Sequence, residues 1–200
     1  MIRSASAISH DSRPVHSPAP DLSRLLLTPE EAAKLDAHGR TDAAVLVPMY
    51  GWPQRPGLVF TERRSDLRRH AGEISFPGGR QDHSDEDLRR TALREAEEEI
   101  GLDPERVELV GALPPIGTYV TSYRVHPFVG LIPDGLDLRP NPAEVATVLN
   151  FELEQLRGAY AMRRLVRRGV PVRTPTFDID RHLIWGATGR ILRDLLERLP

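Results

Sequence analysis

The sequence contains no cysteine, which excludes disulfide bonds, thiolate metal sites and cysteine nucleophiles. Lysine is nearly absent as well, because Lys34 is the only one, so arginine supplies almost all of the positive charge. The net charge of −2 provides no field for nucleic acid, and we expect no nucleic-acid partner. No apolar run approaches the roughly 20 residues of a membrane span, so we expect no membrane partner and a cytoplasmic protein.

The length of 200 residues suits one domain with a sizeable core. Residues 1–20 are rich in serine and proline and lack a hydrophobic segment, so we expect no secretory signal among them. We expect residues 1–20 to be disordered and residues 21–200 to form a single domain.

The hydrophobic pattern predicts strands and helices interspersed along the chain, without internal repeats. Strands are expected at residues 43–49, 57–61, 107–113, 123–132 and 144–151. Helical segments are expected at residues 21–27, 29–38, 153–157 and 184–199, with a hairpin at 163–172 that turns at Arg168-Gly169. The helix after Thr28 opens with a capping box. This alternation indicates an α+β or α/β protein.

We expect a turn at Pro77-Gly78-Gly79, and the acid-rich helix that follows it contradicts the usual rules of helix stability. Glu95 and Glu99 are like charges four residues apart, which costs a helix ~0.2–0.5 kcal/mol. Both lie near the expected helix C-terminus, where each carboxylate opposes the macrodipole at a further ~0.3–1 kcal/mol. A helix that bears both of these unfavourable charge arrangements indicates a functional site. Clustered carboxylates suit a hard cation such as Mg²⁺ or Mn²⁺.

The limits of this helix can be predicted from its capping residues. Ser84 is the expected N-cap, with Asp87 at the third helical position, and Gly101 is the expected left-handed end. At about 100° per residue, Glu95, Glu98 and Glu99 fall within an arc of roughly 100°, so we expect all three to converge on one site. Glu97 points to the opposite side, where we expect solvent.

This segment resembles the Nudix box, whose pattern is G-x5-E-x7-R-E-U-x-E-E-x-G-U, with U a bulky aliphatic residue. The matching residues are Arg94, Glu95, Glu98, Glu99, Gly101 and Leu102. The first half of the box departs from the pattern. Counting back from Arg94 reaches Glu86, whereas counting forward from Gly79 reaches Asp85, so either carboxylate is a candidate to brace the arginine.

Segments outside the box resemble the coenzyme A-hydrolysing branch of the Nudix family. They are Phe60-Thr61-Glu62-Arg63, Leu67 to Gly72, Phe76-Pro77-Gly78-Gly79 and Ile184 to Thr188. The resemblance implies a Nudix-type α-β-α sandwich with a mixed sheet, within the α+β class. It also implies a pyrophosphohydrolase that needs Mg²⁺ or Mn²⁺ and cleaves coenzyme A or its thioesters to 3′,5′-ADP and 4′-phosphopantetheine.

The resemblance also implies roles for individual residues. Glu95 and Glu99 would hold the metal, Glu98 would be a third ligand or a base acting through water, and Arg94 would orient the carboxylates. No covalent intermediate is needed, because water attacks phosphorus in line. Two alternatives stay open. One is hydrolysis of ADP-ribose, a dinucleotide or a nucleoside triphosphate, and the other is a Nudix-like binding module without catalysis, which the retained glutamates disfavour.

Substrate phosphates require cations that do not deprotonate. Arg63 and Arg68 can offer paired N–H groups to phosphate oxygens, and the backbone at Gly78 and Gly79 can approach metal or phosphate. The alternative is that these arginines only reflect the scarcity of lysine. Glu144 is a further candidate carboxylate outside the box, in a place where Nudix enzymes often carry one.

Overall fold

The computed structural model describes residues 21–66, 72–118, 122–167 and 169–200. The disorder expected for residues 1–20 and the phosphate contact expected for Arg68 therefore lie outside the described residues. In the part of the chain that is described, no helix is long and apolar enough to cross a membrane.

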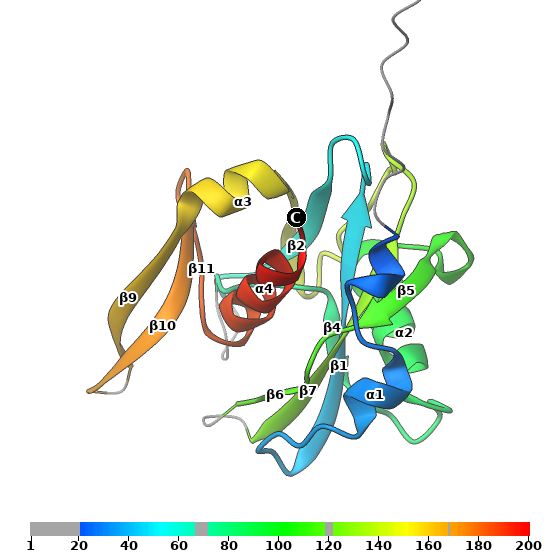
Figure 1. Ribbon diagram of the computed structural model, residues 1–200, viewed down its shortest axis with the longest axis horizontal. Coiled ribbons are helices and arrows are strands. Elements are labelled where there is room, and N and C mark those ends of the chain that lie inside the picture. Colours follow the sequence, from blue (N-terminus) through cyan, green and yellow to red (C-terminus); the bar gives the residue numbers. More distant parts are fainter. Residues whose placement is uncertain (1–20, 67–71, 119–121, 168) are drawn as a thin grey trace, which may run out of the picture.

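An eight-stranded sheet organises the molecule (Figure 1). Its strands are β1 (Thr41–Tyr50), β2 (Gly57–Arg63), β3 (Ile74–Ser75), β4 (Gly78–Arg80), β5 (Glu108–Ala112), β6 (Ile116–Gly117), β7 (Tyr123–Leu131) and β8 (Val145–Glu152). The main order is β3-β2-β1-β7-β5, with β4 paired to β1, β6 to β7 and β8 to β2. Only the β1–β7 pair is parallel among the described pairs, so the sheet is mixed, and the five long predicted strands are correct within two residues at each end.

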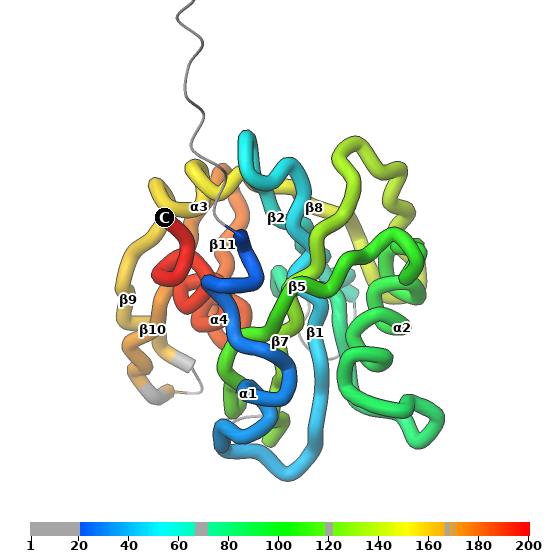
Figure 2. Tube along the Cα trace, turned by 45° about the vertical axis from the view of Figure 1, so that its right-hand side comes forward, coloured from blue at the N-terminus to red at the C-terminus, as the bar shows by residue number. Residues whose placement is uncertain are grey.

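Successive residues of a strand point to opposite faces, and β1 supplies both sides of the core in this way. On one face Leu46 packs in a cluster with Ala96 and Ile100 of α2 (Leu88–Ile100). On the other face Val47 joins a second cluster that includes Leu192 of α4 (Gly186–Arg198). Figures 1 and 2 show α2 and α4 on opposite sides of the sheet, which confirms the α-β-α sandwich and the α+β class.

A second sheet of three antiparallel strands lies beside α4 and was only partly anticipated. It has the order β11-β10-β9, with β9 (Tyr160–Arg167), β10 (Val170–Ile179) and β11 (His182–Ile184). The predicted hairpin is confirmed as the outer part of β9 and β10, but both strands continue inward beyond the prediction. Helix α3 (Leu153–Ala159) connects the two sheets and begins where the sequence predicted it.

Short helical elements precede β1 and follow α2. They are η1 (Leu22–Arg24), α1 (Pro29–Ala33) and η2 (Pro104–Arg106). The capping box at Thr28 is confirmed, but the prediction that this helix runs to His38 was wrong. Residues 33–36 are all exposed, and a short helix without a packed face is not stable in water.

Candidate active site

Helix α2 presents the acidic residues of the site, and its ends are fixed by identifiable contacts. The carboxylate of Asp87 accepts hydrogen bonds from the backbone N–H groups of Arg89 and Arg90, so Asp87 is the N-cap. The prediction of Ser84 as the N-cap was wrong, because Asp87 is the residue whose oxygens reach the free N–H groups of the first turn. Gly101 ends the helix with φ of 65°, as predicted.

Strand β4 brings its backbone directly against α2. A Cβ atom added at Gly79 would lie 2.5 Å from the carboxylate of Glu95, and one added at Gly78 would lie 2.3 Å from the carbonyl oxygen of Ala44. The expected Pro-Gly-Gly turn is therefore wrong for both glycines, because they form a strand paired with β1. A side chain at Gly78 would clash with the backbone of β1, and one at Gly79 would displace the carboxylate of Glu95.

Glu99 is the most unusual carboxylate of the site. The residue is 7% exposed, and its Oε2 atom is buried without a hydrogen-bond partner among the described residues. Burial, followed by the charges of Glu95 and Glu144, raises the pKa of Glu99 to about 8. A buried carboxylate oxygen without a donor is costly, so it indicates that a cation belongs beside it.

Glu95 lies one turn before Glu99 and is also largely buried, with 18% of its side chain exposed. Burial raises the pKa of Glu95, the ion pair with Arg94 opposes this rise, and the charges of Glu98 and Glu144 add to it. The acidic groups therefore already act on one another across this face of α2, so a divalent cation would stabilise their ionised forms.

Arg94 links the acidic groups. Its Nε lies 3.0 Å from Oδ1 of Asp85, its Nη2 lies 3.0 Å from Oε1 of Glu95, and its Nη1 lies 3.0 Å from Oε2 of Glu98. The hydrogen bond to Asp85, followed by the charge of Glu95, raises the pKa of the guanidinium and holds it charged. The contacts agree with an orienting role for Arg94, because one planar group fixes the direction of three carboxylates.

The structure assigns Asp85, rather than Glu86, as the brace of Arg94. Both oxygens of Asp85 accept from Arg94, at 3.0 and 3.1 Å, and Thr91 Oγ1 donates to Oδ2 at 2.9 Å. The hydrogen bond from Arg94 is the main cause that lowers the pKa of Asp85 to about 2. Glu86 is exposed. Sequence reasoning did not identify Thr91, although its spacing of three residues before Arg94 places both on one helix face.

Glu98 differs from the two buried glutamates, because its side chain is 56% exposed and is paired with Arg94. Within the described ranges, no three His, Asp or Glu side chains form a group ready to hold a metal ion. The expected convergence of Glu95, Glu98 and Glu99 is thus not formed, because Arg94 holds Glu98 at the surface. Mg²⁺ usually uses only one or two protein carboxylates and keeps several waters, so Glu95 and Glu99 still suit it.

Two residues from other elements border the acidic face. Arg63 ends β2 and Glu144 precedes β8, and Arg63 Nη2 lies 3.5 Å from Oε2 of Glu144. Both act on Glu99, because the charge of Glu144 raises its pKa and the charge of Arg63 lowers it. The fold therefore places Arg63 and Glu144 at the site beside Glu99, although they are far from it in sequence.

The raised pKa of Glu99 predicts how stability depends on pH when no metal is present. The folded-state pKa of about 8 lies above the ordinary value of 4.5, so folding favours the protonated carboxyl. This contribution is present below pH 4.5 and is lost as the pH rises through 8, by on the order of a few kcal/mol. Urea unfolding in a chelator between these pH values should show the loss. Glu99→Gln should abolish it, whereas Glu97→Gln on the exposed side should keep it; equal slopes in all three proteins would contradict the burial of Glu99.

The sequence matches the NUDIX domain family over residues 40–169. Among curated relatives, the "Uncharacterized Nudix hydrolase NudL" of Citrobacter koseri is 44% identical over 158 residues, which cover 78% of this chain and 81% of the relative. The protein of the same name from Escherichia coli O1:K1 is 43% identical over 155 residues, covering 76% of this chain and 80% of the relative.

Solved structures that match this chain include a C. elegans Ap4A hydrolase binary complex, with a TM-score of 0.48 and 18% identity over 57% of this chain and 82% of that one. The NUDIX domain of Shewanella oneidensis NrtR complexed with ADP ribose has a TM-score of 0.48 and 18% identity over 64% of this chain and 85% of that one.

Proposed function

We propose, from the premise that this chain belongs to the NUDIX domain family and is a Nudix hydrolase, that it cleaves the diphosphate of coenzyme A or its thioesters. The products would be 3′,5′-ADP and a 4′-phosphopantetheine moiety. Hydrolysis of some nucleoside diphosphate derivative follows from the family, and the choice of coenzyme A is the specific proposal.

The observation that carries the metal-dependent chemistry is the buried Oε2 of Glu99, which has no hydrogen-bond partner among the described residues and lies beside a second carboxylate. Glu95 and Glu99 would hold Mg²⁺ or Mn²⁺ as oxygen ligands. When bound, the ion would neutralise charge that develops on the diphosphate and would activate water for attack. Because the ion competes with a proton at Glu99, its affinity should rise with pH up to about 8.

The chain's own residues then have distinct tasks. Glu98 is exposed and lies on the same helix as the two buried glutamates, so it can accept the proton of the attacking water. The water oxygen bonds to one phosphorus, and the bridging P–O bond breaks, so that its oxygen leaves with the other phosphate. Arg94 is a positioning residue, because it holds Glu95 and Glu98 while Asp85 holds it.

The choice of coenzyme A is supported by segments outside the acidic helix. The segments that resemble the coenzyme A branch include Arg63, and this arginine borders the acidic face through Glu144. A guanidinium beside the site can pair with a phosphate of the bound substrate. The pyrophosphate is shared by all candidate substrates, whereas the 3′-phosphate and the pantetheine arm distinguish coenzyme A from ADP-ribose.

A panel of diphosphates tests the proposal directly. The protein would be incubated with Mg²⁺ or Mn²⁺ and with coenzyme A, dephospho-coenzyme A, ADP-ribose or diadenosine polyphosphates. The cleavage products of each substrate would then be quantified. We expect the highest kcat/KM for coenzyme A or its thioesters. Faster turnover of ADP-ribose than of coenzyme A would overturn coenzyme A as the proposed substrate. No turnover of any diphosphate with either metal would overturn the proposal that the protein is catalytic.

Arg68 provides a sharper test of the same substrate. If it contacts the 3′-phosphate, Arg68→Ala should lower kcat/KM for coenzyme A by on the order of 1.5–3 kcal/mol, as expected for a hydrogen bond to a charged group. The loss for dephospho-coenzyme A should be much smaller, because that substrate lacks the 3′-phosphate. Equal losses would instead place Arg68 on the shared pyrophosphate. Arg24→Ala, at an exposed arginine in η1, is a matched control.

A further inference from the structure

Strands β9 and β10 project from the body of the protein as a two-stranded ribbon (Figure 1). Five large apolar side chains are exposed in the described part of the chain, and four of them lie on this ribbon. These four are Tyr160, Met162, Val166 and Val172. Exposed apolar side chains that gather in one place usually mark a contact surface, and an isolated ribbon gains little stability from them.

Most of the ribbon, up to Asp178 near the inner end of β10, carries charge of one sign. Residues 160–177 contain five arginines and neither aspartate nor glutamate. The whole chain carries −2, so the remainder carries −7 with histidine neutral. The protein is therefore electrically polarised, with the ribbon as its positive part, and an anionic surface would attract the ribbon and repel the rest.

Two of these arginines are arranged against the rules of sheet stability. Arg164 of β9 lies directly opposite Arg173 of β10, so their side chains share one face. Like charges at directly opposite positions destabilise a pair of strands. Both side chains are exposed, and no acidic partner faces either of them in the described ranges, whereas the neighbouring Arg163 pairs with Asp178 at 2.8 Å. Such an arrangement indicates a functional surface, because two adjacent guanidiniums can bind one phosphate group.

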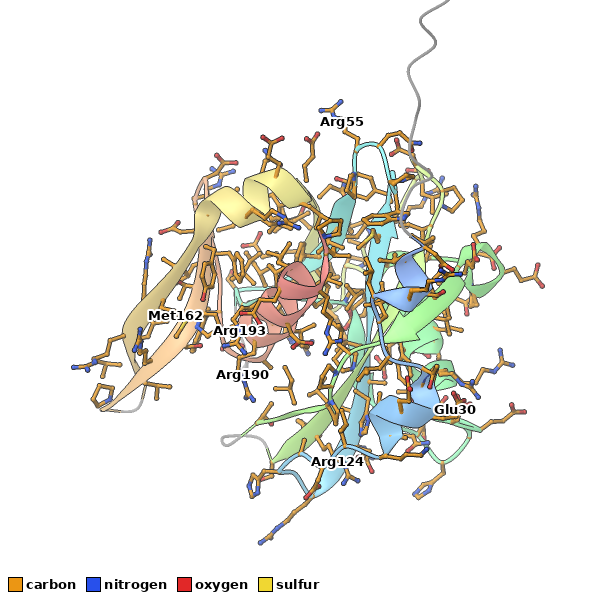
Figure 3. All side chains as sticks on the ribbon, viewed as in Figure 1. Glu30, Arg55, Arg124, Met162, Arg190 and Arg193 are labelled. Carbon is orange, nitrogen blue, oxygen red and sulfur yellow. The ribbon has the colours of Figure 1, made fainter. Side chains whose placement is uncertain are left out.

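Apolar side chains accompany this arginine pair on the same face. Alternate residues of a strand share a face, so Met162, Arg164 and Val166 form one row along β9. Their apolar members are 39% and 72% exposed. Figure 3 shows Met162 on the β9–β10 ribbon. The face thus offers aliphatic groups beside guanidiniums, which is the pairing found where proteins contact lipid headgroups and the start of the acyl chains.

We propose that this face of the β9–β10 ribbon docks the protein on an anionic phospholipid surface. The arginine pair binds lipid phosphates, and Met162 and Val166 enter the interface. The sequence analysis expected no membrane partner because the chain has no apolar run long enough to span a membrane. Docking on a lipid surface does not need such a run. A nucleic acid fits the face less well, because single strands are held by stacked aromatic rings and Tyr160 is the only exposed ring among the described residues of the ribbon. Pairing of two ribbons from two copies is opposed by their equal charge.

Vesicle co-sedimentation tests the proposal with the full chain. The protein would be mixed with vesicles of phosphatidylcholine alone or of phosphatidylcholine with phosphatidylserine. We expect binding only to the anionic vesicles, and binding that weakens as salt increases. Arg164→Glu with Arg173→Glu should lower the partition coefficient at least about tenfold. Val166→Ser should also weaken binding, but without changing its salt dependence.

A matched control separates the surface from the total charge. Arg24→Glu with Arg106→Glu changes the net charge by the same amount at exposed positions of η1 and η2, and this variant should bind vesicles like the original protein. Circular dichroism would verify the fold, and Arg164→Gln with Arg173→Gln replaces the glutamate pair if that pair fails to fold. Equal binding by the ribbon and control variants would overturn the proposal. No binding to anionic vesicles, displacement from them by single-stranded RNA, or a dimer in solution that the ribbon variants dissociate would overturn it as well.

Discussion

Glu99→Gln is expected to lower metal-dependent diphosphate hydrolysis by about a hundredfold or more, because it removes a charged ligand while keeping the shape of the side chain. Glu95→Gln should have a similar effect. Both changes relieve repulsion on α2 and the cost of a buried charge, so thermal stability without metal should stay level or rise. The measurements are initial rates with Mg²⁺ or Mn²⁺, and thermal unfolding in a chelator.

Glu97→Gln is the matched control, because Glu97 lies on the same helix, has the same chemistry and is exposed. It should keep nearly full activity. Titration with Mn²⁺, followed by its paramagnetic signal, gives a readout independent of turnover, and both buried-site variants should bind the ion more weakly than the control. Near-normal rates in Glu95→Gln and Glu99→Gln would contradict the proposal that these residues bind the metal.

Asp85→Asn is expected to have the second largest effect, on both stability and rate. The change removes the carboxylate that accepts hydrogen bonds from Nε and Nη2 of Arg94. The side chain of Asp85 is only 5% exposed. Breaking a buried ion pair costs 3–5 kcal/mol, and because Arg94 is 27% exposed we expect about 2–3 kcal/mol here. The value of kcat should fall about tenfold or more, since Glu95 and Glu98 lose their common support.

Glu86→Gln is the matched control for this prediction, because it neutralises the adjacent exposed carboxylate and should change stability by less than about 0.5 kcal/mol. A second check uses pH. The pKa of Asp85 is about 2 in the folded state against an ordinary value of 3.8, so its contribution is present above pH 3.8 and is lost as the pH falls towards 2. The stability difference between Asp85→Asn and the original protein should shrink in that range. A larger loss of kcat in Glu86→Gln would contradict the assigned brace.

Much of the secondary structure follows from short stretches of sequence. The long strands of the main sheet were predicted within two residues because alternating apolar residues act locally. The same holds for the capping box at Thr28 and for the end of α2 at Gly101, since each depends on contacts within a few residues. The concentration of carboxylates on one helix was equally visible, because helical periodicity alone places Glu95 and Glu99 on one side.

The state of the site, in contrast, depends on contacts between distant segments. Asp85 and Glu86 could not be ranked from the sequence, because the choice depends on how the loop before α2 returns towards Arg94. The glycines of β4 look like a turn in the sequence, and only pairing with β1 makes them a strand against Glu95. Sequence alone thus determined which chemical groups the protein has and on which elements they lie. The tertiary structure decided the pKa of Glu99 and the partners of Arg94, because burial and pairing arise when helix, sheet and loops pack together.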